Sequence, residues 1–167
     1  MAKVLVIRLS AIGDVAMTVP VIYSAAKANP EDSFTVLTQA FLMPLFMNRP
    51  PNVEVIGINT KGAEKGLIGL LKFISALLKF DFDVILDLHN VIRTIIICTF
   101  FRLNGKRVFV LDKARKERKR LTAIKGKRLY PLRPVIVRYA DVFRAAGLNY
   151  TETFTSLYDC LLYTSDA

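Results

Sequence analysis

Short apolar segments alternate with helical patterns along most of this 167-residue chain. The expected strands cover residues 3–8, 34–37, 53–58, 84–88 and 107–111. The expected helices cover residues 14–28, 40–47, 66–79, 91–103 and 134–146, with a kink at Pro20 and an end at Gly147. Strands that are separated by helices form right-handed βαβ units around a parallel sheet. The sequence therefore predicts an α/β fold with a doubly wound, Rossmann-like parallel sheet.

The position of a binding site follows from this fold class. Doubly wound sheets bind ligands outside the carboxyl ends of their strands, where the strand order reverses. The loops after the first and the fourth expected strands are therefore the candidate site. They contain the stretch SAIGD at residues 10–14 and the pair His89-Asn90.

The composition argues against several other classes of protein. Hydrophobic residues make up 53% of the chain, which is too many for a disordered protein. The longest apolar segment, residues 66–80, is interrupted by Lys72 and Lys79 and is shorter than the roughly 20 residues that span a bilayer. With two cysteines and one histidine, neither a disulfide framework nor a zinc site is expected. The first residues indicate a strand rather than a signal peptide, so we expect a cytoplasmic protein.

Positive charge is concentrated in one segment. Residues 106–128 hold eleven of the 24 Lys and Arg residues and two of the 14 acidic residues, whereas the rest of the chain is nearly neutral. Such a segment favours an anionic partner, such as a phosphate, an acidic sugar, an anionic lipid or a nucleic acid. Nucleic acid is the weaker interpretation, because the basic run has no interleaved aromatic residues and no known nucleic-acid module surrounds it. A solvated surface is the alternative.

The turn after the first strand leads into a helix and contains Ser10, Gly13 and Asp14. The first N–H groups of a helix lack internal partners and attract anions. Gly13 would allow a positive φ or the close approach of a ligand. Neither GxGxxG nor GxxxxGK[ST] is present, so dinucleotide and P-loop sites are not predicted. Asp14 has two possible roles: it caps the helix, or it accepts the proton of an attacking hydroxyl.

The loop after the fourth strand offers further polar groups. His89 and Asn90 could hydrogen-bond a ligand or cap the loop, and His89 is an alternative general base. Arg93 and Thr94 open the next helix, where a cation beside a helix N-terminus suits a carboxylate or a phosphate. A solvated Arg93 is the alternative. Asp87 is expected to orient the loop rather than to react.

The stretch KVLVIRLSAIGDVAMTVPVI, residues 3–22, resembles the amino-terminal signature of glycosyltransferase family 9, the lipopolysaccharide heptosyltransferases. That signature has an aliphatic strand, a basic residue, a turn of small residues, Gly-Asp, and a proline six residues after the aspartate. A second stretch, DVILDLHNVIRT, resembles the segment around the family's fourth strand, although the family often has Gln-Gly where this chain has His89-Asn90. The resemblance covers most of residues 1–159.

The resemblance implies a bacterial GT-B glycosyltransferase with two Rossmann-like domains. The amino-terminal domain binds a lipid A and inner-core saccharide, and the carboxyl-terminal domain binds the nucleotide sugar, usually ADP-heptose. Transfer is inverting, needs no metal or other cofactor, and uses the aspartate of Gly-Asp, here Asp14, as general base. We expect residues 1–159 to be the acceptor-binding domain, inactive alone, with an acceptor site formed by Ser10, Gly13, His89, Asn90, Arg93, Thr94, Lys113, Arg115 and Arg118.

Three further expectations concern the rest of the chain. The basic run would recognise a phosphorylated acceptor at the inner face of the inner membrane, and the helix at residues 67–78 is either core or a membrane contact. Residues 160–167, CLLYTSDA, resemble the translation of a sequencing adaptor, so we expect native sequence to end near Asp159. The alternative function is a non-catalytic Rossmann-like module that binds anions or RNA through the basic segment.

Overall fold

The computed structural model describes residues 1–62, 65–121 and 131–156, except the side chains of Lys116, Arg118 and Arg120. The strands are β1 (Lys3–Ile7), β2 (Ser33–Gln39), β3 (Val53–Ile58), β4 (Val84–Asp87) and β5 (Arg107–Val110). The helices are α1 (Ile12–Ala16), α2 (Val19–Ala28), the 3-10 helix η1 (Ala40–Phe46), α3 (Gly66–Leu78), α4 (Ile92–Leu103), α5 (Arg115–Leu121) and α6 (Val135–Ala145). All five expected strands are present. The expected tail at residues 160–167 lies outside the described residues.

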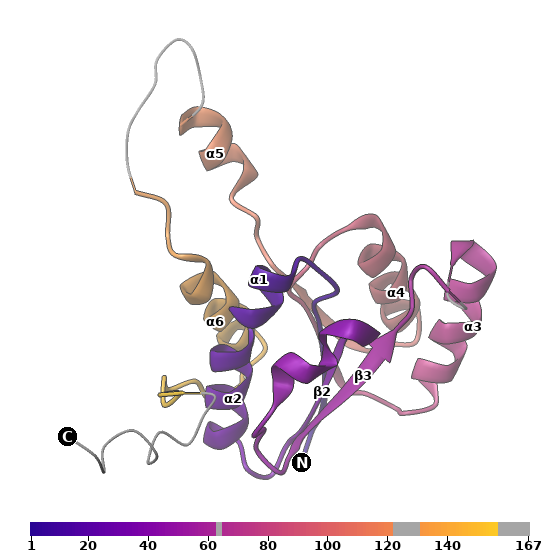
Figure 1. Cartoon of the computed structure of the whole chain (residues 1–167), viewed down its shortest axis with the longest axis horizontal. Helices are drawn as coiled ribbons and strands as arrows, with labels where there is room; N and C mark the ends of the chain where they lie inside the picture. The colour runs from indigo at the N-terminus through magenta and orange to yellow at the C-terminus, as the bar shows by residue number, and fades with distance from the viewer. Residues whose placement is uncertain (63–64, 122–130, 157–167) are drawn as a thin grey trace, which may run out of the picture.

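The strands form one parallel sheet in the order β3-β2-β1-β4-β5 (Figure 1). β1 is central, and its Val6 lies opposite Val36 of β2 and Leu86 of β4. The chain first moves outward from β1 to β3 and then crosses back to place β4 on the other side of β1. The strand order therefore reverses between β1 and β4, as in Rossmann-type sheets. The predicted α/β, Rossmann-like fold is confirmed.

Alternate residues of β1 face opposite layers of helices. Val4 and Val6 belong to a core that includes α2 and α6, whereas Leu5 and Ile7 belong to a core that includes α3 and α4. In Figure 1 these two pairs of helices lie on opposite sides of the sheet. Because both faces of the strand are covered, its last four residues, 4–7, are all aliphatic and 0% exposed.

The helix expected at residues 14–28 is divided into α1 and α2, so the prediction of one kinked helix is wrong. In a continuous helix, Pro20 would have no N–H to donate to the carbonyl of Ala16, and its ring would clash with that carbonyl. α1 therefore ends at Ala16, and Pro20 lies in the first turn of α2, where proline is tolerated. The Thr18 hydroxyl donates to Val15 O at 2.6 Å within the break.

α6 has a defined end and a closely packed face. Gly147 has a φ of 83°, and the following Leu148 N–H donates to Phe143 O at 3.1 Å, which is the pattern of a Schellman motif. The predicted end at Gly147 is confirmed. Tyr139 and Phe143 are both 0% exposed, and the Phe143 ring stacks on Phe34 of β2 with 6.5 Å between centroids.

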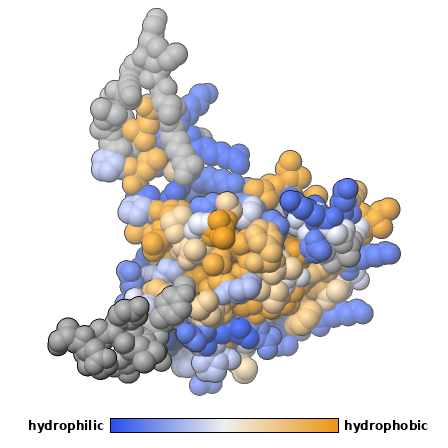
Figure 2. All heavy atoms as spheres, viewed as in Figure 1, coloured by the Kyte–Doolittle hydropathy of each residue, from blue (hydrophilic) through white to orange (hydrophobic). Residues whose placement is uncertain are grey.

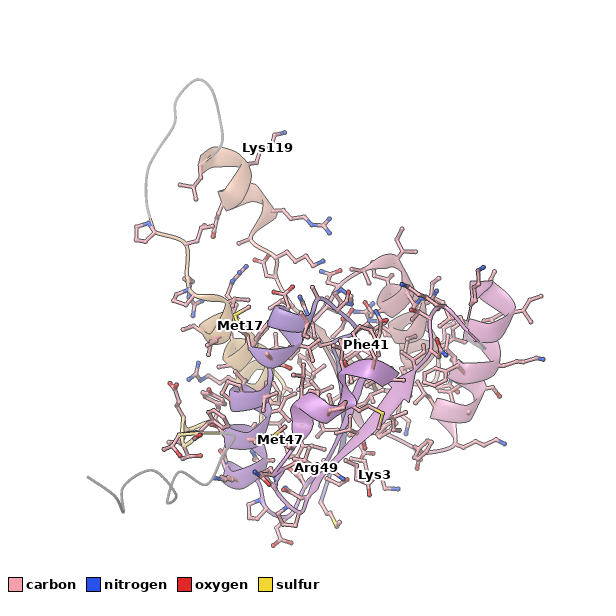
Figure 3. All side chains as sticks on the ribbon, in the orientation of Figure 1. Lys3, Met17, Phe41, Met47, Arg49 and Lys119 are labelled. Atoms are coloured by element: carbon pink, nitrogen blue, oxygen red, sulfur yellow. The ribbon has the colours of Figure 1, made fainter. Side chains whose placement is uncertain are left out.

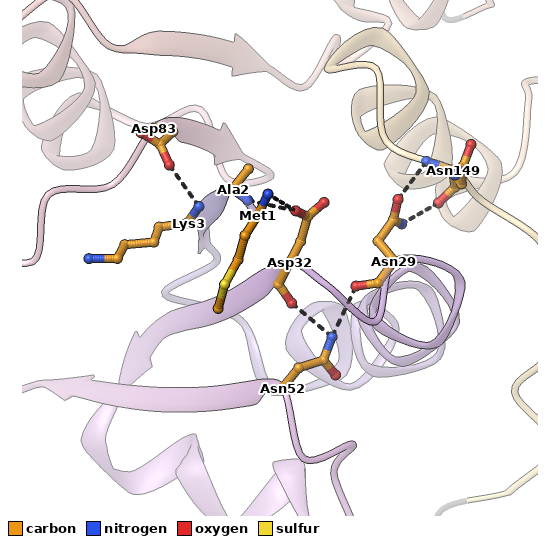
Figure 4. Close-up of polar contacts among 8 residues, drawn as sticks. All are labelled: Met1, Ala2, Lys3, Asn29, Asp32, Asn52, Asp83 and Asn149. Carbon is orange, nitrogen blue, oxygen red and sulfur yellow. Dashed lines mark hydrogen bonds and ion pairs between the residues drawn. The ribbon is translucent and has the colours of Figure 1, made fainter.

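Polar contacts close the amino end of the sheet (Figure 4). Asp32 accepts a hydrogen bond from Ala2 N at 2.6 Å, and Asp83 accepts one from Lys3 N at 2.8 Å. The side-chain amide of Asn52 donates to Asp32 O at 2.9 Å. Side chains at this end of the sheet therefore hold neighbouring segments together. Among the described residues, no helix combines the length and the apolar character needed to cross a membrane.

Phe143→Ala should destabilise the chain, because it removes a fully buried ring from the contact between α6 and the sheet. Loss of a buried phenylalanine side chain lowers the free energy of unfolding by about 3–5 kcal/mol. Urea denaturation followed by circular dichroism measures the change. Ile68→Ala is the control, because Ile68 is 75% exposed and its loss should change the free energy by less than about 0.5 kcal/mol. Equal unfolding midpoints for Phe143→Ala and the wild type would contradict this packing.

Candidate functional site

The carboxyl ends of β1 and β4 open into a hollow of about 380 Å³. The hollow lies where the strand order reverses, which is the position at which doubly wound sheets bind ligands. Its walls come from the turn after β1, the loops after β4 and β5, and α6. The polar and charged residues in these walls are Arg8, Ser10, Asp14, His89, Lys113, Arg138 and Tyr139.

Arg8 directly follows β1 and is only 6% exposed. Its Nη1 donates to Leu88 O at 2.6 Å, and its Nη2 donates to Asp14 in an ion pair. The guanidinium also lies 5.8 Å from the centroid of the Tyr139 ring, within range of a cation–π contact. The sequence prediction did not include Arg8 among the site residues. A cation at the end of a buried aliphatic strand is unusual, and this signal could have identified it.

Asp14 is the third residue of α1, and its side chain is 41% exposed. Ala11 is the N-cap of α1, and no side chain caps this helix, so the interpretation of Asp14 as the helix cap is wrong. Instead, Arg8 holds the Oδ2 atom of Asp14 at the wall of the hollow. A carboxylate that is fixed in position and still accessible can accept the proton of a ligand hydroxyl.

His89 faces the same hollow as a neutral side chain at pH 7. Burial, together with the charges of Arg8 and Lys113, lowers the pKa of His89 from 6.5 to about 4. An imidazole of such low basicity is a poor proton acceptor at neutral pH. Its Nε2 lies 3.4 Å from Ser10 Oγ. Ser10 and His89 therefore both line the hollow and can form hydrogen bonds with a ligand.

Asp87 at the end of β4 is 0% exposed and organises the loop that follows. Its Oδ1 accepts hydrogen bonds from His89 N at 2.9 Å and Asn90 N at 2.8 Å, and its Oδ2 accepts one from Thr94 Oγ1 at 2.8 Å. The expected orienting role of Asp87 agrees with these contacts. Thr94 is also fully buried. The structure therefore places the Thr94 hydroxyl inside the loop and not at the hollow.

Other predicted residues are distributed around the same edge of the sheet. Asn90 lines a neighbouring hollow of about 430 Å³ together with Lys113 and Arg115, and its amide donates to Leu111 O at 3.1 Å. Lys113 lines both hollows. Arg93 is half-buried on α4 and is not among the residues that line either one. The structure thus brings together only part of the predicted acceptor site.

Gly13 and the residues of α5 are the last of the predicted site residues to be located in the structure. The backbone of Gly13 is helical, so of the two alternatives that a glycine allows here, the positive φ is not the one adopted. A Cβ on Gly13 would meet none of the surrounding atoms within 4 Å, which leaves room for a ligand beside Asp14. In Figure 3, Lys119 on α5 and Lys3 at the amino end of β1 lie on opposite sides of the molecule. The side chain of Arg118 lies outside the described part of the chain.

Two residues of the hollow, Arg138 and Tyr139, come from α6 and were not predicted. A tyrosine on the apolar face of a helix indicates core, and a neighbouring arginine indicates solvated surface. Their position beside Arg8 results from the packing of α6 against the sheet, for which the sequence has no local signal.

Comparisons with known proteins show similarity in fold to glycosyltransferases. The sequence matches no protein-family model and no curated protein. A family 9 glycosyltransferase from Veillonella parvula has a TM-score of 0.64 and 21% identity, over 89% of this chain and 42% of that chain. The E. coli heptosyltransferase WaaC with ADP-2-deoxy-2-fluoro heptose has a TM-score of 0.61 and 21% identity, over 92% of this chain and 50% of that chain.

WaaC with ADP gives the same TM-score of 0.61, with 22% identity over 92% of this chain and 49% of that chain. This chain therefore spans half or less of the length of the solved structures that it resembles. The expected resemblance to family 9 glycosyltransferases is confirmed at the level of the fold.

The stability of the chain should fall through His89 as the pH is lowered from about 6.5 to about 4. The unfolded imidazole has an ordinary pKa of 6.5 and binds a proton in this range, whereas the folded one stays neutral down to about pH 4. Stability falls as the pH is lowered wherever the unfolded state binds more protons. His89→Gln should therefore lose less unfolding free energy than the wild type between pH 7 and pH 5. Urea denaturation at the two pH values tests this, and equal losses would contradict it.

Proposed function

We propose that this chain is the acceptor-binding domain of a glycosyltransferase of lipopolysaccharide core synthesis. The enzyme would transfer heptose, or a related sugar, from a nucleotide sugar to a lipid A inner-core acceptor. The observation that carries the proposal is the Arg8–Asp14 ion pair, which holds a carboxylate at the hollow beside β1 and β4. The family 9 signature in residues 3–22 and the similarity in fold to WaaC support it.

The residues at the hollow suit the acceptor side of an inverting transfer. A sugar hydroxyl is a weak nucleophile at neutral pH. Asp14 would accept its proton while the oxygen forms a bond to the anomeric carbon of the donor. The bond between that carbon and the nucleoside diphosphate breaks on the opposite face, so the configuration inverts. Arg8 keeps the carboxylate in place because it is itself bonded to Leu88 O.

The donor side is assigned to a second domain. A nucleoside diphosphate that departs gains negative charge, which an enzyme must stabilise. One WaaC structure contains ADP, and we propose ADP-heptose as the donor for this enzyme as well. Because the chain spans half or less of its structural relatives, we assign the donor site to a further Rossmann-like domain and expect no turnover from this chain alone. Transfer without a metal ion belongs to the proposal as well.

Asp14→Asn should abolish most of the transfer in the protein that joins this chain to its donor-binding domain. Loss of a general base lowers kcat by about 10²–10⁴-fold, whereas acceptor affinity should change little because asparagine keeps the size of the side chain. Release of ADP from ADP-heptose measures turnover, and calorimetry measures acceptor binding. Glu54→Gln, an exposed carboxylate on β3, is the control. Preserved turnover in Asp14→Asn would reject the base, and salt-sensitive RNA binding that survives the substitution would favour a non-catalytic module.

We also propose that the carboxyl edge of the sheet contacts an anionic membrane surface. Helices in βαβ units run antiparallel to the strands, so α3 and α4 begin at this edge. Their first turns expose Leu67, Ile68 and Ile92, which are 61%, 75% and 79% exposed. In Figure 2 apolar side chains, in orange, protrude among charged ones, in blue, on the side where α3 and α4 lie. Lys113 and Arg115 add positive charge to this edge.

Vesicle co-sedimentation tests the membrane contact. The chain should bind vesicles of phosphatidylglycerol and phosphatidylethanolamine, but not vesicles of phosphatidylcholine alone. Leu67→Ser combined with Ile68→Ser should weaken binding at least about tenfold, because each apolar side chain that enters the interface contributes. Leu103→Ser is the matched control, since Leu103 is 78% exposed at the opposite end of α4. Equal losses in both variants would reject the contact at this edge.

A further inference from the structure

Four buried side-chain polar atoms, all on residues that line the hollow, have no hydrogen-bond partner among the described residues. They are Arg8 Nε, His89 Nδ1, Arg138 Nε and the Tyr139 hydroxyl oxygen. In the rest of the described chain, only Thr38 Oγ1 is in the same situation. Folded proteins pair the great majority of their buried polar groups, because an unpaired one destabilises the fold. Four such atoms in one hollow indicate that a ligand supplies their partners.

At least three of these groups are hydrogen-bond donors. The guanidinium N–H groups of Arg8 and Arg138 keep their protons at all ordinary pH values. Burial raises the pKa of Tyr139 above its ordinary value of 10.0, so the hydroxyl also keeps its proton. Arg8 is 6% exposed and Tyr139 is 0% exposed, which leaves the hollow as the place where their partner can lie. A ligand group that satisfies several donors at once must be rich in acceptor oxygens.

The charges at the hollow select an anionic group. Among the described residues that line it, Arg8, Lys113 and Arg138 are cations, Asp14 is the only acidic residue, and His89 is neutral at pH 7. Three cations and one carboxylate among these residues give the lining a net positive charge. An excess of this sign, at the mouth of a partly enclosed hollow, attracts an oxyanion.

We propose that Arg8, Arg138 and Tyr139 form an oxyanion subsite, which binds a carboxylate or phosphate group carried by the same ligand whose hydroxyl approaches Asp14. The role of that hydroxyl rests on the proposed function, whereas the subsite itself does not. Tyr139 determines specificity, since its hydroxyl reaches the ligand from the buried face of α6. The proposed subsite recognises an anion directly beside the general base. The basic segment at residues 106–128 is a separate candidate for anion recognition.

Calorimetric titrations of the 167-residue chain test the subsite. The probes are glucose 6-phosphate and glucuronate, with glucose as the neutral counterpart. At least one of the anionic sugars should bind, and glucose should not. Tyr139→Phe and Arg138→Gln should each weaken that binding about tenfold, as expected for the loss of one hydrogen bond to a charged group. Arg102→Gln removes an exposed cation at the far end of α4 and should leave the affinity unchanged.

The two anionic sugars identify the group, since the one whose affinity falls in Tyr139→Phe carries the oxyanion that the subsite accepts. Tyr139→Phe should also keep or raise the urea midpoint of unfolding, because its hydroxyl has no partner to lose. Wild-type affinity in both variants, or a lowered midpoint in Tyr139→Phe, would overturn the subsite. These titrations contain no nucleotide sugar and measure binding alone, so a failure of the proposed transfer leaves this result unaffected.

Discussion

The candidate site depends on one buried cation at the end of the central strand. A guanidinium enclosed by protein without partners would strongly destabilise the fold. Arg8 is stable where it is because Leu88 O and Asp14 accept its hydrogen bonds and the Tyr139 ring lies beside it. These partners belong to the end of β4, to α1 and to α6. Arg8 therefore ties together the three segments that surround the hollow, and the position of Asp14 follows from it.

The hydrogen bonding of polar side chains differs between the two ends of the sheet. At the amino end, the side chains of Asp32, Asn52 and Asp83 are hydrogen-bonded to neighbouring backbone, as Figure 4 shows. At the carboxyl end, Arg138 and Tyr139 hold buried atoms without a partner among the described residues. Unpaired groups lower stability, and proteins keep such groups where function requires them. Polar side chains at the amino end thus support the fold, whereas those at the carboxyl end belong to the proposed binding site.

The sequence was sufficient for features that depend on local pattern. Continuous aliphatic runs predicted the strands, and Gly147 predicted the end of α6. Features that depend on tertiary packing could not be predicted from the sequence. Asp14 bonds Arg8 rather than the helix backbone, and Arg8 is itself held by Leu88 O, which follows β4 and is distant in sequence. Tyr139 contributes to the hollow only because α6 packs against the sheet. In the sequence alone, a tyrosine at a binding site cannot be distinguished from one in the hydrophobic core.

The charges in the turn after β1 and in α1 support the proposed acceptor role of this domain. In dinucleotide-binding folds, the turn after the first strand leads a diphosphate to the free N–H groups of a long helix. Here α1 covers only Ile12–Ala16, and Asp14 lies in its first turn. A carboxylate at this position repels a diphosphate, while it suits a hydroxyl that must lose a proton. In the proposed subsite, anion binding is left to side chains from α6 and the end of β1, which line the same hollow. These features support the proposed acceptor role of the domain, in which the donor nucleotide is assigned to another domain.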